Sequence, residues 1–367
     1  MNAYERVAAA LSGSQPDRVP ILTYLNGDSP NIGPLLQQNI LDHSDVFYSR
    51  RLYAGFGGTG FDAETATEPL DDGWTRVTHT ICGARFEEVL KRGTHGDYVG
   101  YARHIYAVPS DLEKLLDLPR LAARENPRLH AWIAETNAAA TECLARGAFV
   151  RVVVRDPLYV VAGHVMPEDM ALWSVEQRGL LRQCMDMIVA QQLDYLAYAL
   201  GSLEPRVIYH IAGAEYALPP LMSPSDFDEF VMGYDRPLCE LVHAHGGLIY
   251  CHSHGKVRRF LDRFVAMGAD GLHPLEPVGA TGDCDLPEVK ATFGDRLCLM
   301  GNVQYDDFAR LTPAAMRQTV RDAVLAGKPG GRFVLCPSCT PYHNPLPPTV
   351  EGNIIAFIEA GLEYGAY

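Results

Sequence analysis

The sequence lacks any run of about 18 consecutive apolar residues, the length that a helix needs to cross a membrane. Its first residues, Met1 to Arg6, show no basic stretch followed by an apolar core, so the pattern of a secretory signal is missing as well. We therefore expect a cytoplasmic protein with no membrane partner.

Basic residues are scarce relative to acidic ones. Lys and Arg number 31 and Asp and Glu number 45, which gives a formal net charge of −14. Because phosphate binding needs a basic face, this balance argues against nucleic acid as a partner. The nine cysteines are an odd number scattered along the chain, which predicts reduced thiols rather than a disulfide framework.

The 367 residues, 47% of them hydrophobic, are enough for a large buried core. Beyond residue 109, helical and strand patterns alternate. The strands are expected at residues 149–154, 206–211, 248–252, 271–275, 297–303 and 332–335. The helices are expected at residues 129–146, 172–200, 223–245, 256–267, 286–293, 313–326 and 348–362. Polar residues follow each strand, so the pattern favours a single α/β domain over residues 1–367, a (β/α)8 TIM barrel. The rival is an open doubly wound sheet, which the lack of a glycine-rich fingerprint after a first strand at 21–25 disfavours.

The N-terminal part of the sequence has a different pattern of expected helices and strands from the rest. Helices are expected at residues 1–13 and 34–43, with Pro34 in the first helical position of the second. Alternating, turn-rich segments over approximately 70–108 predict an excursion of antiparallel strands that covers one end of the barrel. Ser110 and Glu113 have the spacing of a capping box for the next helix.

One stretch, Leu248 to Gly255, combines a strand with metal-binding side chains at its end. Side chains two apart in a strand share a face, so His252 and His254 should point together while Cys251 points away. Two imidazoles at this spacing can bind one divalent metal, most commonly zinc. The alternative is that these are ordinary polar residues at a strand end.

In a TIM barrel, the site lies where the strands end. The polar side chains at those ends are Asn26 and Asp28, Asp156 and Tyr159, His210 and Glu215, His252 and His254, His273 and Glu276, Asn302 and Gln304, and Cys336 to His343. From these, and from Tyr216 next to Glu215, we select Asn26, Tyr159, Tyr216 and Asn302 as candidate substrate-binding residues. Glu215 is a candidate fourth ligand, a catalytic general base or a solvated loop acid.

A catalytic zinc site typically has three protein ligands and one open position. A cysteine near the last strand would complete the set with His252 and His254. Cys339 lies further past the strand than Cys336 and is therefore preferred, although the choice stays open. The C-x-x-C spacing of this pair also suits a redox dithiol, but such a pair usually opens a helix, whereas this one leads toward Pro341.

Several motifs spread along the chain resemble those of the uroporphyrinogen decarboxylase superfamily, which includes the cobamide-dependent methyltransferases. They are Glu5–Leu11 with Pro16–Pro20, Pro220–Pro224, Gly268–Gly271, Phe293–Arg296 with Met300–Val303, and Gly352–Ala360. The resemblance implies a (β/α)8 barrel and is compatible with a homodimer. Decarboxylases of this superfamily have an arginine-bearing RQAGRY segment after the first strand. Here Thr23–Asp28 contains no arginine, which disfavours porphyrinogen decarboxylation.

The methyltransferase branch binds zinc through an H-x-C-G motif at a strand end and a cysteine near the last strand. His252-Ser253-His254-Gly255 is similar to the first motif, with histidine in place of cysteine, and Cys339 matches the second. The resemblance thus implies Zn²⁺ bound by His252, His254 and Cys339, and a corrinoid carried by a partner protein. The methyl group would move between that corrinoid and a small substrate such as a methyl ether, methylamine or thiol.

Exchanging one thiolate for an imidazole makes the metal centre more positive and a stronger Lewis acid, which leaves the direction of transfer open. Two other functions fit the same motifs. One is a metal-independent decarboxylase of the uroporphyrinogen type, and the other is a non-catalytic metal-binding relative with a closed four-ligand shell.

Overall fold

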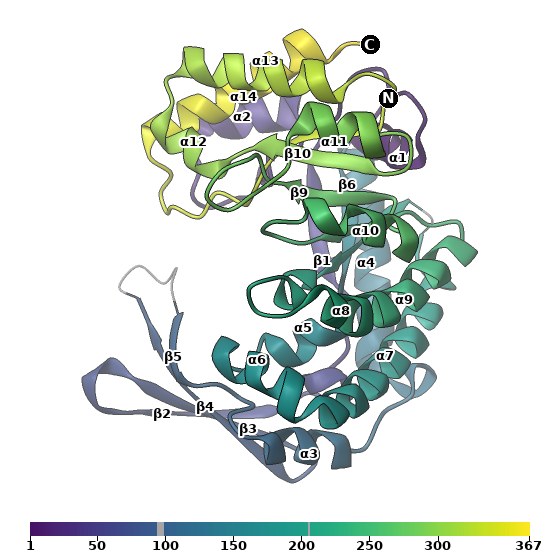
Figure 1. Ribbon diagram of the computed structural model, residues 1–367, viewed down its shortest axis with the longest axis vertical. Coiled ribbons are helices and arrows are strands. Elements are labelled where there is room, and N and C mark those ends of the chain that lie inside the picture. The colour runs from purple at the N-terminus through teal and green to yellow at the C-terminus, as the bar shows by residue number, and fades with distance from the viewer. Residues whose placement is uncertain (94–98, 205) are drawn as a thin grey trace.

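The computed structural model describes residues 1–93, 99–204 and 206–367. Its main feature is a parallel sheet of seven strands with helices along its outer side (Figure 1). The strands, in spatial order, are β1 (Phe47–Arg51), β6 (Phe149–Arg155), β7 (Val207–Ala212), β8 (Ile249–His252), β9 (Gly271–Leu275), β10 (Cys298–Val303) and β11 (Phe333–Pro337). The parallel α/β architecture predicted from the alternation is therefore confirmed.

The segment expected as the first strand makes only an isolated bridge. Ile21 pairs with Leu335 of β11, and Leu22 N–H donates to the Leu335 carbonyl at 2.9 Å. On the other side, the N–H of Asp45, two residues before β1, donates to the Ile21 carbonyl at 2.8 Å. These bonds put Ile21 between the two ends of the sheet. An eighth strand and complete closure of the barrel stay predictions.

The helices lie close to where the sequence pattern places them, apart from those at 157–162 and 305–310, which it does not predict. They are α1 (Ala3–Ser12), α2 (Pro34–His43), α3 (Pro109–Asp117), α4 (Pro127–Ala145), α5 (Pro157–Ala162), α6 (Pro167–Glu176), α7 (Arg178–Leu200), α8 (Pro224–Phe227), α9 (Gly233–Ala244), α10 (Leu261–Met267), α11 (Leu286–Phe293), α12 (Tyr305–Arg310), α13 (Pro313–Gly327) and α14 (Pro348–Gly365). No helix within the described ranges combines the length and apolarity needed to cross a membrane.

Two local expectations were wrong. The expected capping box does not form: Val108 is the N-cap of α3 and has no side-chain acceptor, and Asp111, not Glu113, accepts the Val108 N–H at 3.3 Å. The reason is Pro109, which occupies the first helical position. The helix expected over 223–245 also divides into α8, a π-helical turn at Asp228–Met232 and α9.

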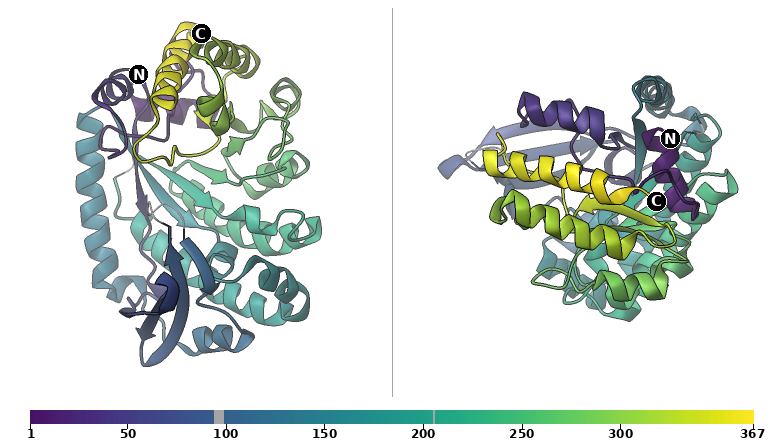
Figure 2. Two further views of the ribbon diagram at one scale, coloured as in Figure 1. Left: turned by 90° about the vertical axis from the view of Figure 1, so that its left-hand side faces the viewer. Right: turned by 90° about the horizontal axis from the view of Figure 1, so that it is seen from above.

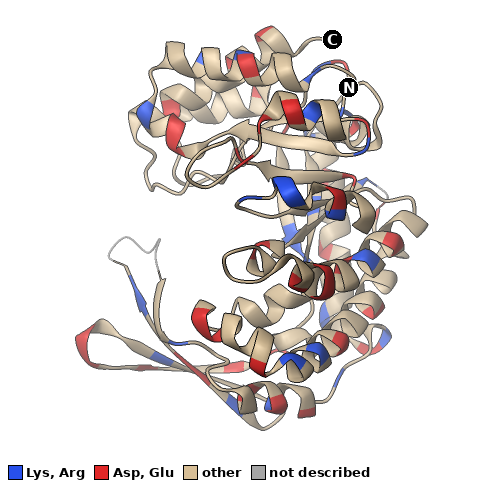
Figure 3. Cartoon of the chain, in the orientation of Figure 1, with Lys and Arg blue, Asp and Glu red and all other residues tan. Residues whose placement is uncertain are grey.

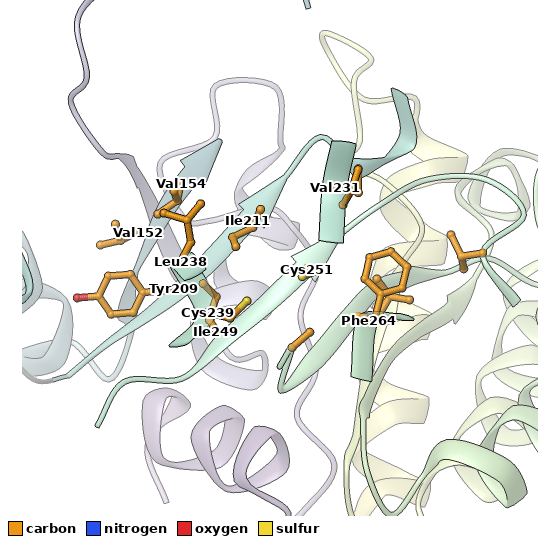
Figure 4. Packing of buried hydrophobic residues seen from close by; sticks show 14 of the residues in the cluster. Val152, Val154, Tyr209, Ile211, Val231, Leu238, Cys239, Ile249, Cys251 and Phe264 are labelled. Carbon is orange, nitrogen blue, oxygen red and sulfur yellow. The ribbon is translucent and has the colours of Figure 1, made fainter. Parts of the chain in front are cut away.

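The core has two parts, one on each side of the sheet. On the inner face, α1 places Val7, Ala10 and Leu11 against Tyr250, Met300 and other strand residues. On the outer face, helices α9 and α10 cover β6, β7 and β8, and Leu238, Cys239 and Phe264 pack there (Figure 4). The inner face is thus filled at the end where α1 lies, and its polar residues are left at the strands' carboxyl ends.

The antiparallel excursion is a separate four-stranded sheet of β2 (Glu64–Pro69), β3 (Thr75–Ile81), β4 (Ala84–Arg92) and β5 (Val99–Arg103) (Figures 1 and 2). It begins earlier than the predicted residue 70, and residues 94–98 of the prediction lie outside the described residues. Phe86 anchors this sheet, because its ring contacts Phe56 and Tyr106 with centroids 5.1 and 6.0 Å apart. Charges of both signs are spread over the surface helices (Figure 3).

Candidate functional site

The end of β8 presents two histidines on the inner face of the sheet. The rings of His252 and His254 lie 4.7 Å apart between centroids and almost perpendicular, at 87°. Cys251 points to the opposite side, where it is 1% exposed and packs near Cys239 of α9 (Figure 4). Strand alternation thus separates His252 from Cys251, and His254, two residues past the end of β8, lies beside His252.

A hydrogen-bonded chain from β11 fixes the orientation of His252. The Nε2 atom of His273, on β9, lies 3.0 Å from the Pro337 carbonyl, which can only accept, so Nε2 carries the proton. His273 Nδ1 is then free to accept the Nδ1–H of His252 at 2.9 Å. This network assigns a lone pair to Nε2 of His252, the form that can bind a metal or accept a proton.

Burial keeps these imidazoles neutral. It lowers the pKa of His252 to about 3, with further lowering by His254 and Arg151. Burial and then His252 lower the pKa of His273 well below its usual value. A metal-binding histidine must be unprotonated at one ring nitrogen, and both groups meet that condition at neutral pH.

Glu276 orients the second histidine. Its Oε1 lies 2.8 Å from Nδ1 of His254, which leaves Nε2 of that ring without a proton when the imidazole is neutral. Burial lowers the pKa of His254, but the hydrogen bond and charge of Glu276 and the charge of Glu215 outweigh this, and the net shift is upward. A carboxylate on the far nitrogen is the usual partner of a metal-binding histidine.

Glu215 lies in the short 3₁₀ turn Ala214–Ala217 that follows β7. Its Oε2 is buried and makes no hydrogen bond within the described part of the chain. Burial raises the pKa of Glu215, against the smaller lowering effects of its own backbone and of His254. The side chain is therefore a buried acid close to the histidines, suited to holding a proton or to becoming a ligand.

Below the histidines, the inner face carries further polar side chains. Arg151 of β6 donates from Nη1 to the Tyr250 hydroxyl at 2.8 Å, and its guanidinium lies 5.4 Å from the Tyr24 ring. Tyr24 in turn stacks on His273 with centroids 4.3 Å apart. A cavity of about 360 Å³ adjoins this group and is lined by Tyr24, Asn26 and Arg151 among others. Both ring nitrogens of His210 are buried without a hydrogen-bond partner in the described structure.

The two late cysteines differ in environment. Cys336 is fully buried in the inner core, and its thiol donates weakly to the Val334 carbonyl at 3.8 Å. Cys339 is half-buried, and burial followed by the charges of Glu276 and Asp306 raises its pKa to about 11. This electrostatic coupling to Glu276 makes Cys339 the better candidate for a set that includes His254.

The described residues contain no group of three His, Cys, Asp or Glu side chains that already has metal-binding geometry. The chemistry of the donor set nevertheless fits zinc, since it comprises two neutral imidazoles with their second nitrogens hydrogen-bonded and a thiol. Binding would then require Cys339 or Glu215 to move toward the histidines. The ligand set stays a prediction.

The candidate substrate-binding residues fall into two groups. Tyr159 and Tyr216 face each other edge-on with centroids 5.4 Å apart, beside Glu215. Asn26 accepts from Asp28 N–H at 3.1 Å within its own turn, and Asn302 donates to the Leu275 carbonyl at 2.8 Å. The tyrosines therefore form an aromatic pair beside Glu215, while the two amides are already engaged with the protein.

Asp156 does not belong to the inner face. It is the N-cap of α5, with Oδ1 accepting from Leu158 N–H at 2.6 Å, and it faces Asp235 of α9 behind the sheet. Burial raises the pKa of Asp156 to about 7, and burial together with Asp156 raises that of Asp235 well above its usual value. The two carboxyls thus belong to the outer core, where burial favours their protonated forms.

Reasoning from sequence missed Arg151 and the role of His273 as the support of His252. One signal was available for Arg151, because a cation interrupts the otherwise β-branched run of β6. A charge within a strand that is buried on both faces needs a special environment. The contact between His273 and His252 has no sequence signal, since 21 residues separate them.

A comparison with family models finds one match, described as uroporphyrinogen decarboxylase (URO-D), over residues 106–364. Among solved structures, a methyltransferase from Methanosarcina mazei has a TM-score of 0.59 and 20% sequence identity, with 99% of each chain covered. A broad-specificity GH5-4 endoglucanase from Clostridium longisporum has a TM-score of 0.39 and 10% identity over 70% of this chain and 85% of its own. A search of curated proteins found no match.

Proposed function

The chain belongs to the uroporphyrinogen decarboxylase family, and from that premise we propose that it is a zinc-dependent methyltransferase. It would move a methyl group between a small substrate and a corrinoid carried by a partner protein. The observation that carries this proposal is the pair of oriented imidazoles at the end of β8. Each has its Nδ1 bound to a neighbouring side chain and its Nε2 left for a metal. The full-length likeness in fold to a methyltransferase supports it.

His252, His254 and Cys339 would hold the metal. Bound zinc would supply a Lewis acid that activates a thiol or polarises the heteroatom bearing the methyl group. The protein's own contribution is to orient the ligands: His273 holds the ring of His252, and Glu276 holds the ring of His254. Without a metal, the Cys339 thiol keeps its proton, because its pKa is raised to about 11.

Glu215 would donate or accept a proton beside the metal. Its raised pKa, due first to burial, favours the protonated form and makes the acid able to protonate a departing oxygen, nitrogen or sulfur. Once deprotonated, it would act as the general base or become the fourth ligand. Tyr159 and Tyr216 would supply the apolar walls that keep water from the transferring methyl group.

Metal analysis tests the proposal. Protein purified without chelator should contain one zinc per chain, and His254→Ala or Cys339→Ala should reduce that content to less than a tenth. Cys336→Ala is the matched control, since it removes a neighbouring thiol of the inner core, and its zinc content should be unchanged. A chain without zinc, or a His254→Ala variant with full zinc, would contradict the proposal.

The family description itself favours a second candidate, a metal-independent decarboxylase acting on a polycarboxylated tetrapyrrole. Arg151 on the inner face would then be the group that binds a substrate carboxylate. This function predicts release of CO₂ from uroporphyrinogen at a rate that a chelator leaves unchanged. The proposed methyl transfer predicts no CO₂ and complete loss of activity when the zinc is removed.

A further inference from the structure

The small cavity next to Arg151 lies where the two ends of the sheet meet. It is formed by the segment 24–26, the first residues of β1, Arg151 of β6 and Thr340 after β11. Its volume of about 360 Å³ is at the lower end of the range of small-molecule sites. None of the described residues that line it is acidic. The cavity therefore has room for a ligand of a few heavy atoms and contains a cation without an anion.

Arg151 donates only to neutral oxygens. Its Nε and Nη2 atoms donate to Ser49 Oγ at 3.2 and 2.7 Å, and its Nη1 donates to the Tyr250 hydroxyl at 2.8 Å. A guanidinium has five N–H bonds, so two of them remain without an acceptor in the described part of the chain. The guanidinium also lies 4.4 Å from the centroid of the Phe47 ring. A cation held among aromatic rings and hydroxyls is stabilised most by an anion, and the protein supplies none here.

Tyr24 provides a second unused donor in the same cavity. Its hydroxyl is buried and forms no hydrogen bond within the described residues. The backbone of Tyr24 has φ 58°, a left-handed conformation that a bulky residue rarely adopts. Strain of this kind persists only where the surroundings hold it, and it is concentrated at ligand-binding positions. The Tyr24 ring is held by Phe47 edge-on, with centroids 5.2 Å apart, and by stacking on His273.

We infer that this cavity binds a small carboxylate anion of the size of formate or acetate. A carboxylate only accepts hydrogen bonds, so its two oxygens can take the free N–H groups of Arg151 and the O–H of Tyr24. A single cation in the lining selects a single negative charge. A dianion such as sulfate would bring a second charge that no lining residue neutralises. The apolar side chains of Leu25 and Phe47 suit the methyl group of acetate.

The site is separate from the positions proposed for the metal. Tyr24 stacks on His273, and His273 accepts the Nδ1–H of His252, so the cavity adjoins the histidines on the side of Nδ1. The Nε2 atoms proposed as metal ligands belong to the other side of those rings. The inference thus goes beyond the proposed function and rests on neither of the two candidate activities.

Calorimetric titration of the chelated protein with acetate tests the inference, with acetamide as the uncharged control of the same shape. We expect saturable binding of acetate with a Kd of about 0.1–10 mM, and at least tenfold weaker binding of acetamide and of sulfate. Arg151→Met should weaken acetate binding by tenfold or more, and Tyr24→Phe by about threefold. Arg50→Gln is the matched control, because Arg50 faces outward to Glu135 and Thr136, and its affinity should stay within twofold.

Thermal unfolding gives a second measurement. The midpoint should rise with acetate in the wild type and stay constant in Arg151→Met, because only a ligand that binds the folded state stabilises it. Tyr24→Phe removes one oxygen atom and keeps the test valid if Arg151→Met does not fold. Butyrate should bind less tightly than acetate. Butyrate binding ten times more tightly would show that the carboxylate is the end of a larger molecule, and would overturn the ligand size inferred here.

Three results would overturn the site itself: no saturable binding of acetate, equal binding of acetate and acetamide, or equal losses in the Arg50 and Arg151 variants. Because the titration uses protein freed of metal, its outcome is independent of the zinc analysis. A chain that never binds zinc would contradict the methyltransferase and leave the anion site, whereas a zinc-containing chain that ignores acetate would do the reverse.

Discussion

The two faces of β8 have opposite characters, although they are formed by alternate residues of one short strand. On the inner face, His252 is held by His273, and just beyond the strand His254 is held by Glu276. On the outer face, Ile249 and Cys251 are buried against helices α9 and α10. The inner polar groups are oriented by hydrogen bonds and remain partly accessible, while the outer residues contribute burial alone. Changes on the two faces should therefore separate stability from metal binding.

The largest effect on stability should come from the outer face. Phe264 of α10 is fully buried and packs on Phe227 with ring centroids 5.4 Å apart. Phe264→Ala should lower the free energy of unfolding by about 3–5 kcal/mol, because it removes buried area and leaves a cavity. Denaturant unfolding measures this loss. Leu172→Ala, at a half-exposed position, is the control and should change stability by less than about 0.5 kcal/mol. If the folded fraction of the Phe264 variant contained less zinc than the wild type, the separation of the two faces would be wrong.

The next effect concerns the inner face and is measured as metal affinity. His273→Leu removes the acceptor for His252 Nδ1–H and should weaken zinc binding by about 10- to 100-fold, the usual cost of losing a partner behind a metal ligand. Competition with a chromophoric chelator gives the affinity. His273→Asn offers an amide oxygen near the Nδ1 position and should recover part of the loss. Equal affinities for the leucine variant and the wild type would show that the chain from Pro337 to His252 has no role.

The buried carboxyl pair behind the sheet predicts a dependence of stability on pH. The pKa of Asp156 is raised to about 7 in the folded protein and is near 4 in the unfolded chain, so the folded state binds more protons between these values. Stability contributed by this pair is therefore full below about pH 4 and is lost as the pH rises toward 7. Asp235→Asn should raise the free energy of unfolding by about 1–3 kcal/mol at pH 8 and change it little at pH 4. Denaturant unfolding at both pH values tests this, with exposed Asp186→Asn as the control. A gain of equal size at both pH values would contradict the raised pKa of this pair.

The smallest expected effect is the change in stability of two variants that each lose one thiol. Cys251→Ala should cost about 1 kcal/mol through lost packing and leave the zinc content unchanged. Cys339→Ala should change stability by a similar or smaller amount but remove the zinc. Metal analysis beside thermal unfolding distinguishes them. Loss of zinc from the Cys251 variant alone would show that the ligands were assigned to the wrong face.

The elements whose patterns are local were predicted well. The bounds of β9 and α11 match the sequence expectation, and α2 begins at Pro34 as the pattern requires. Predictions failed where distant contacts decide the structure. β1 has the mixed sequence Phe-Tyr-Ser-Arg-Arg, which is a strand because it pairs with β6, about 100 residues away. The sequence also predicted one continuous helix where α6 ends and α7 begins at Gln177.

The candidate site likewise has features set by the local sequence and features set by distant contacts. Strand alternation by itself determined that His252 and Cys251 lie on opposite faces of β8, because side-chain direction in a strand has a period of two. The tertiary structure alone decided which nitrogen of each histidine is free. His273, Glu276 and the Pro337 carbonyl come from later segments and meet β8 only through parallel pairing and the packing of loops.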